Sequence, residues 1–115
     1  MPLLDTDQLT AISAGVPELL LPILEDFQGT TREALENLRQ TLTAGRMQDA
    51  SSEFHQLKGA SGTLGLREFH DRCARYEAEA TTALSSAAPD ELLTLLESSV
   101  AAARDFLVQA PGPGA

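Results

Sequence analysis

The chain has no tryptophan, one tyrosine and one cysteine among its 115 residues. A single cysteine excludes an internal disulfide and any zinc site built from several thiolates. No apolar run approaches the roughly 18–20 residues that a membrane-spanning helix needs, and no signal peptide is visible at the start of the sequence. We therefore expect a soluble intracellular domain in the cytoplasm, with no membrane partner.

Basic residues are scarce as well. Eight lysines and arginines stand against 17 aspartates and glutamates, which gives a net charge of −9. Nucleic acids and anionic membranes are bound by clustered lysine and arginine, so this acidic chain is a poor candidate for either. The sequence also has no glycine-rich phosphate loop and no strand–turn–helix setting for a nucleophilic serine. ATP binding and serine hydrolase chemistry are therefore not expected.

Leucine and alanine dominate the apolar residues, and their spacing predicts helices separated by short breaks. A short helix capped by Asp5 or Thr6 is expected to stop near Gly15, and a long one to run from Pro17 until just before Gly45. Three more are expected at about 47–64, at 66–80 and from Pro89 onward, after a linker at 85–88. The sequence predicts an all-α fold, an up-and-down four-helix bundle with a short additional N-terminal helix. Residues 1–109 would form the domain, and the Pro/Gly tail 110–115 would be disordered.

Each predicted helix has an apolar face at three- and four-residue spacing. The short helix carries Leu9 and Ile12, and the apolar face of the long helix is interrupted at Gly29-Thr30-Thr31. The other expected core positions are Leu20, Ile23, Phe27, Ala34, Leu38 and Leu42, then Leu66, Phe69, Cys73, Tyr76 and Ala80, and finally Leu93, Leu96, Val100, Ala103 and Leu107.

The stretch 54–65 is the most informative part of the sequence. Its helix buries a stripe formed by Ala50, Phe54, Leu57, Ser61 and Leu64. His55 is one residue off this stripe, so its ring should lie at the rim of the core and reach solvent. Gly59 and Gly62 follow on the same side of the helix, and each costs roughly 1 kcal/mol relative to alanine. This pattern indicates a surface kept bare so that another molecule can approach the ring.

A rim histidine suits nucleophilic chemistry, because an imidazole with a pKa near 6.5 offers a free ring nitrogen at pH 7. Lys58 lies three residues on, within reach of a phosphate on the ring. Residues 58–75 contain four basic and two acidic side chains, whereas the rest of the chain contains four basic and 15 acidic ones. A metal site on the face shared by His70, Cys73 and Glu77 is the weaker interpretation, because Cys73 falls on the apolar stripe. No metal is predicted.

The segment from His55-Gln56-Leu57-Lys58-Gly59 to Leu64-Gly65, followed by Phe69, Cys73 and Glu77, resembles the signature of the histidine-containing phosphotransfer (HPt) domain family. The resemblance is detailed over the histidine helix and the next helix. It extends to the whole chain in length and helix count.

The resemblance implies a four-helix bundle that relays phosphoryl groups in multistep two-component signalling. Nε2 of His55 would accept the group from an aspartate of one response-regulator receiver domain and pass it to another. The implied partners are receiver domains, a hybrid sensor histidine kinase, or both. Mg²⁺ would belong to the receiver, with no cofactor bound by this chain and no kinase activity of its own.

The resemblance also implies roles for particular residues. Lys58 would steady the phosphate charge, and Glu77 would accept a hydrogen bond from Nδ1 of His55 and leave Nε2 nucleophilic. Gly59 and Gly62 would give the partner access. The expected rim contacts of a small, transient interface are Ser52, Gln56 and Arg67.

Two other functions stay open. The chain would be a helical adaptor if it bound a partner without turning over phosphate. It would be the phosphoacceptor module of a larger kinase, in the manner of chemotaxis kinases, if further domains were joined to it. We expect a monomer, and we expect His70 to be a surface residue rather than a second phosphoacceptor because it lacks the Lys-Gly context.

Overall fold

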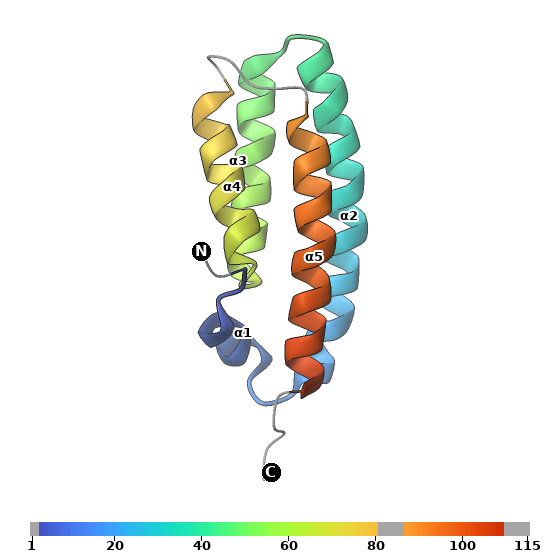
Figure 1. Cartoon of the computed structure of the whole chain (residues 1–115), viewed down its shortest axis with the longest axis vertical. Helices are drawn as coiled ribbons and strands as arrows, with labels where there is room; N and C mark the ends of the chain where they lie inside the picture. Colours follow the sequence, from blue (N-terminus) through green and yellow to red (C-terminus); the bar gives the residue numbers. More distant parts are fainter. Residues whose placement is uncertain (1–2, 81–86, 110–115) are drawn as a thin grey trace.

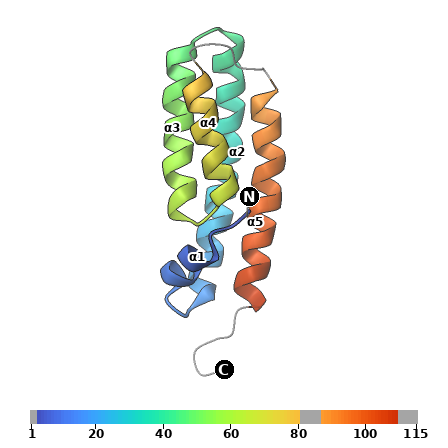
Figure 2. The same ribbon diagram turned by 60° about the vertical axis from the view of Figure 1, so that its left-hand side comes forward.

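The computed structural model describes residues 3–80 and 87–109, and these residues form five helices and no strand (Figure 1). The helices are α1 (Thr6–Ser13), α2 (Pro17–Thr43), α3 (Met47–Thr63), α4 (Arg67–Glu79) and α5 (Ala88–Gln109). The four long helices alternate in direction side by side, and α1 lies at the end of the bundle below α3 and α4 (Figures 1 and 2). The predicted all-α class is confirmed.

The helix ends lie where turn and cap residues occur. Asp5 caps α1, and its side chain accepts a hydrogen bond from the backbone nitrogen of Gln8 at 3.1 Å. Gly45 and Gly65 follow α2 and α3 with φ values of +75° and +72°. Glycine adopts this left-handed conformation without the steric cost of a Cβ atom, so both turns depend on it.

The N-terminal segment is fastened to the α3–α4 turn. The backbone nitrogen of Asp5 donates to the oxygen of Gly65 at 2.8 Å, and that of Glu68 donates to Leu3 at 3.2 Å. Leu9 of α1 is fully buried beneath this turn, against Gly65. The segment therefore closes the end of the bundle where the histidine helix finishes.

The core is one cluster of leucine, alanine and aromatic side chains, and most predicted core positions belong to it. Two expectations were wrong, because Ile23 is 50% exposed and Ile12 is 36% exposed. Phe27, Ala34 and Leu93 are partly buried and pack against the cluster. Leu24 and Leu92 take the fully buried places, because a neighbouring residue points about 100° away around a helix axis.

Helix α2 is continuous through Gly29-Thr30-Thr31, and its apolar face is interrupted there by a buried polar residue, Thr31. One local prediction needs correction. Ala88, expected in the linker, is already a buried residue of α5. Ser85 and Ser86 of that linker, and the tail 110–115, lie outside the described residues.

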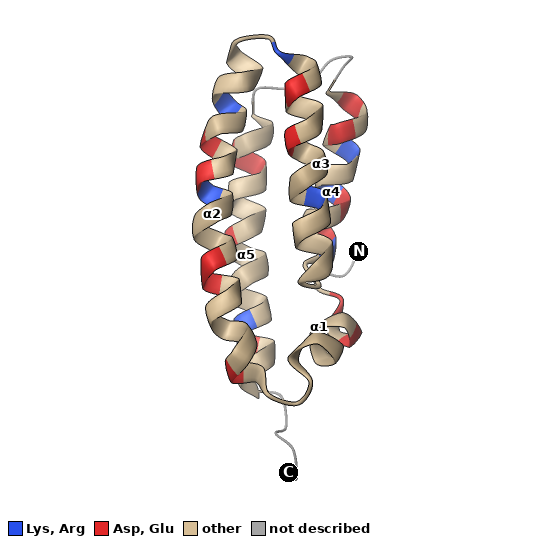
Figure 3. Cartoon of the chain, turned by 180° about the vertical axis from the view of Figure 1, so that it is seen from behind, with Lys and Arg blue, Asp and Glu red and all other residues tan. Residues whose placement is uncertain are grey.

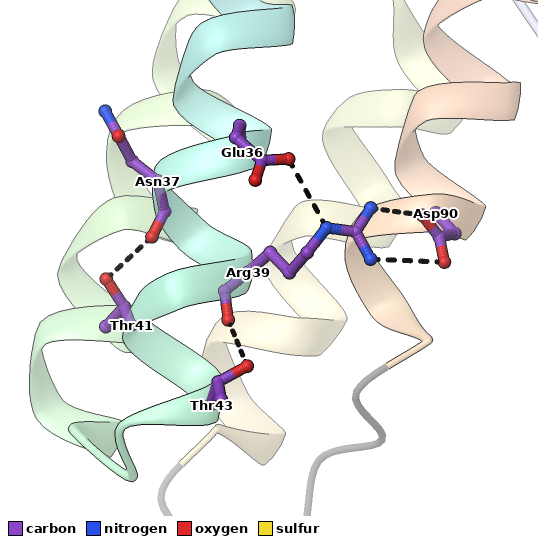
Figure 4. Close-up of polar contacts among 6 residues, drawn as sticks. All are labelled: Glu36, Asn37, Arg39, Thr41, Thr43 and Asp90. Carbon is purple, nitrogen blue, oxygen red and sulfur yellow. Dashed lines mark hydrogen bonds and ion pairs between the residues drawn. The ribbon is translucent and has the colours of Figure 1, made fainter.

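Ion pairs join α2 to α5. Arg32 binds Glu97 in the middle of α5 through Nε at 2.7 Å and Nη2 at 2.8 Å, and Arg39 pairs with Asp90 near the start of α5 (Figure 4). These guanidinium groups hold the pKa values of Glu97 and Asp90 below their usual range. All four groups are exposed to solvent, so the pairs orient the two helices more than they stabilise them.

Acidic residues are distributed along the described helices, with few lysines and arginines among them (Figure 3). None of the described helices is long and apolar enough to cross a membrane.

Candidate phosphoacceptor site

His55 lies on α3 with its side chain 66% exposed. Phe54 and Leu57 are buried, and they define the face of α3 that packs against the core. Position 55 is therefore held at the edge of that face, as the sequence predicts.

Glu77 of α4 bridges His55 and Lys58. Its Oε1 atom lies 2.8 Å from Nδ1 of His55, and its Oε2 atom lies 2.8 Å from Nζ of Lys58. The hydroxyl of Ser51 donates to the backbone oxygen of Glu77 at 3.3 Å. One carboxylate thus connects the nucleophile candidate to the cation candidate, and both belong to α3.

This contact determines where the proton of the imidazole resides. The Lys58 ammonium lowers the pKa of Glu77, burial opposes this effect, and the hydrogen bond from His55 lowers the pKa further. An ionised carboxylate only accepts hydrogen bonds, so Nδ1 of His55 must be the donor. In the neutral ring Nε2 then carries a lone pair, and this is the nitrogen available for nucleophilic attack.

The positive charge predicted around His55 is largely paired. Arg75 binds Glu79 at 3.2 Å, and Lys58 binds Glu77. Arg72 is hydrogen-bonded to Tyr76, which helps to raise the pKa of Arg72. Arg67 is exposed at the start of α4 and has no ion pair within the described residues. It is therefore the cation of this region most readily available to a partner.

The two glycines of α3 have different surroundings. A Cβ atom placed on Gly59 would meet nothing within 4 Å, so the surface beside His55 is bare there. A Cβ atom on Gly62 would lie 2.8 Å from Nδ1 of His70. The close approach at Gly62 is therefore made by this chain's own α4, which corrects the interpretation of Gly62 as open surface.

Hollows formed by the described residues lie on several sides of the histidine helix. Ser52 and Gln56 line a small one of about 350 Å³ together with His55, Ser51 and Glu77. Arg67 lines a polar one of about 630 Å³ on the other side of Gly59. A third, of about 660 Å³, is a groove between α2 and α3 that includes Gln56. Its apolar lining residues are Ile23, Phe27, Ala34, Leu57, Ala60 and Leu64, and polar residues, including the carboxylates Asp26 and Glu53, line the rest.

Cys73 is fully buried, and burial raises the pKa of its thiol to about 12. It packs with the core stripe of α4, as its sequence position predicts. Among the described residues, no three histidine, cysteine, aspartate or glutamate side chains are grouped so that they could hold a metal ion.

Sequence reasoning missed several contacts of this site. The Lys58–Glu77 ion pair, the Ser51 hydrogen bond and the bond between His70 and the Lys58 backbone all cross from α3 to α4. The rotation of one helix against its neighbour decides such contacts. The only signal in the sequence was the seven-residue spacing that puts His70 and Glu77 on one face of α4.

A family model described as Hpt domain matches residues 22–106 of the chain. The match covers most of the sequence and includes the whole of α3 and α4. The chain belongs to the Hpt domain family, the histidine phosphotransfer domains of two-component signalling, which interact with receiver domains and kinases. Searches of curated proteins and of solved structures found no match.

Proposed function

We propose that the chain is an intermediate of a multistep phosphorelay, in which His55 receives a phosphoryl group from one receiver aspartate and passes it to another. The observation that carries the proposal is the 2.8 Å contact between Nδ1 of His55 and Glu77, combined with the 66% exposure of the His55 side chain. It leaves Nε2 unprotonated and accessible from solvent.

In the first transfer, the lone pair of Nε2 attacks the phosphorus of an aspartyl phosphate. The N–P bond forms, and the P–O bond to the aspartate breaks, so the carboxylate is the leaving group. The ring gains positive charge while Nδ1 keeps its hydrogen, and the Glu77 carboxylate stabilises that charge. In the second transfer a receiver carboxylate attacks the phosphorus, and the N–P bond breaks and returns the lone pair to Nε2.

Lys58 is proposed to stabilise the negative charge of the phosphoryl group. Its ammonium is held on Glu77, on the same α3 face as His55 and one turn further along. Because it is partly exposed, its contribution to the transfer is expected to be modest. Mg²⁺ is assigned to the receiver, which would position the phosphoryl group, while this chain supplies the nucleophile and the docking surface.

The receiver is proposed to dock over Gly59 and the α2–α3 groove. Gln56 lines both this groove and the hollow at His55, so the two surfaces are continuous. Ile23 of the groove lining is 50% exposed, and Leu19, one helical turn earlier on α2, is 67% exposed and continues this apolar surface toward the start of α2. An apolar centre beside a single nucleophile fits a small, transient interface. A monomer acting in the cytoplasm remains our expectation.

The test is transfer of labelled phosphate from a panel of phosphorylated receiver domains to the wild-type chain and to His55→Gln. We expect acid-labile, alkali-stable label on the wild type, mapped to the peptide with His55, and none on the variant. Circular dichroism should show an equally folded variant. Label that persists in His55→Gln contradicts the assignment, and a folded wild type that no receiver labels favours the adaptor function.

A further inference from the structure

His70 lies in the first turn of α4, with its side chain half-buried against α3. Its Nδ1 atom is 2.8 Å from the backbone oxygen of Lys58. A carbonyl oxygen only accepts hydrogen bonds, so Nδ1 of His70 carries the hydrogen and donates it. This histidine is thus committed to a contact inside the chain.

The contact depends on the glycine at position 62. An ideal Cβ atom there would lie 2.8 Å from Nδ1 of His70, closer than real side chains allow, and 3.2 Å from Cε1, a tight contact. Any residue other than glycine would push the ring away from the Lys58 oxygen. The helix-propensity cost of Gly62, about 1 kcal/mol, therefore has a structural reason distinct from that of Gly59.

Helix α4 holds Lys58 at two points. His70 binds its backbone oxygen, and Glu77 binds its ammonium group. His70 and Glu77 are seven residues apart, so they occupy one face of α4 about 10 Å apart along its axis. The second point is the carboxylate that also binds Nδ1 of His55.

Directional bonds matter at this helix pair, because apolar packing tolerates small rotations. A rotation of α3 by about 20° moves a side-chain atom at a radius of about 5 Å, such as Nδ1 of His55, by roughly 2 Å, which is enough to break its hydrogen bond to Glu77. The contacts of Phe69, Cys73 and Tyr76 with the core have no such angular requirement. A bond from one helix to the backbone of the other restricts the rotation.

We propose that His70 is a positioning residue for His55. By binding the backbone of Lys58, it fixes the rotation of α3 at which Glu77 meets Nδ1 of His55, and so it keeps Nε2 of His55 unprotonated. The consequence for phosphotransfer rests on the proposed function, whereas the effect on the His55 ring does not.

The first test is nitrogen-15 NMR of the His55 ring at pH 8.5, where imidazoles are neutral. The wild type should show a protonated Nδ1 and an unprotonated Nε2. In His70→Ala both nitrogens should move toward intermediate shifts, and transfer from a phosphorylated receiver should fall by about tenfold, the upper range for one neutral hydrogen bond. His70→Asn should restore the ring-nitrogen shifts and the transfer rate in part. The amide nitrogen of asparagine is separated from Cα by the same number of bonds as Nδ1 of histidine, so it can donate to the same oxygen.

A double-mutant cycle with Gly62→Ala gives the second test. Gly62→Ala should reproduce the His70→Ala phenotype, and the double variant should be no worse than either single one, since all three lack the same bond. Gly59→Ala is the matched control for the NMR measurement, because its Cβ meets nothing within 4 Å. Its His55 spectrum should match the wild type.

Several results would overturn the proposal. These are a folded His70→Ala with an unchanged His55 spectrum, losses that multiply in the double variant, or a His70→Asn that behaves like His70→Ala. If His70→Ala does not fold, the His55 spectra of Gly62→Ala and His70→Asn replace it. An unchanged spectrum in a folded Gly62→Ala then overturns the proposal. A wild type that accepts no phosphate contradicts the relay instead, and the NMR comparison still tests His70.

Discussion

Glu77 and His55 are 22 positions apart in the sequence, yet their side chains meet at 2.8 Å across the α3–α4 interface. The carboxylate orients the ring and places its hydrogen on Nδ1, while Lys58 keeps that carboxylate ionised by lowering its pKa. The reactivity of the exposed nitrogen therefore depends on a residue of the neighbouring helix.

Removing this carboxylate should slow the transfer. Glu77→Ala loses a charge-assisted hydrogen bond to His55, and we expect the single-turnover rate from a phosphorylated receiver to fall on the order of tenfold or more. Glu77→Gln keeps an acceptor without the charge and should lie between that variant and the wild type. Glu33→Gln, at an exposed position of α2, is the control. An unchanged rate in Glu77→Ala would show that the contact has no role in the chemistry.

Gly59 should tolerate a larger residue structurally but not functionally. Gly59→Gln removes a helix-propensity cost of roughly 1 kcal/mol, so the melting temperature should hold or rise by a few degrees. Transfer should be blocked because the new side chain covers the approach to His55. Gly29→Gln on α2, which also has open space around it, should have the same effect on stability and leave transfer normal. Normal transfer in Gly59→Gln would contradict the bare-surface interpretation.

The α2–α3 groove can be tested apart from the chemistry of His55. Ala60→Glu places a charge among the apolar lining residues and should slow transfer from a receiver by about tenfold or more, since a buried charge without a partner opposes association. Phosphorylation of His55 by the small donor phosphoramidate should be unaffected. Ala101→Glu, at an exposed position of α5, is the matched control. Equal receiver kinetics for both variants would place docking elsewhere.

The Arg39–Asp90 pair predicts a pH effect on stability. Arg39 lowers the pKa of Asp90 in the folded state from its ordinary value of 3.8. The resulting stabilisation is present above that value and is lost as the pH falls through the lowered pKa of the folded state. Denaturant titrations at pH 7 and pH 3 should therefore show a smaller acid-induced loss for Asp90→Asn than for the wild type.

Asp105→Asn is the control for this titration, since Asp105 has no ion pair within the described residues. Its acid-induced loss should match that of the wild type. If Asp90→Asn loses as much stability on acidification as Asp105→Asn does, the pair contributes nothing to the pH dependence. The effect is expected to be small because both partners are exposed.

Much of the fold could be predicted because the relevant signals are local. Capping by Asp5, the turns at Gly45 and Gly65 and the apolar spacing of α3 and α4 all follow from near neighbours in the sequence. The wrong choice of Ile23 and the only partial burial of Leu93 have one cause. Adjacent apolar residues give two overlapping stripes, and only packing against the other helices selects one.

The site was predictable to a similar extent. The exposure of His55 and the bare surface at Gly59 follow from the pattern of a single helix. The pairing of Lys58 with Glu77 and the ring that fills the space at Gly62 do not, because they depend on how α3 is rotated against α4. Spacing within one helix places a residue on a face, but it does not identify the side chain opposite.

The fastening of the N-terminal segment to the α3–α4 turn has a kinetic consequence. Asp5 bonds to Gly65 across 60 residues, whereas α3 and α4 are joined by a short turn and pack from neighbouring sequence. Contacts between distant segments close later, because more chain entropy must be lost first. We expect α1 to dock last during folding and to open first in hydrogen exchange, exposing the end of the histidine helix while the rest of the bundle stays closed.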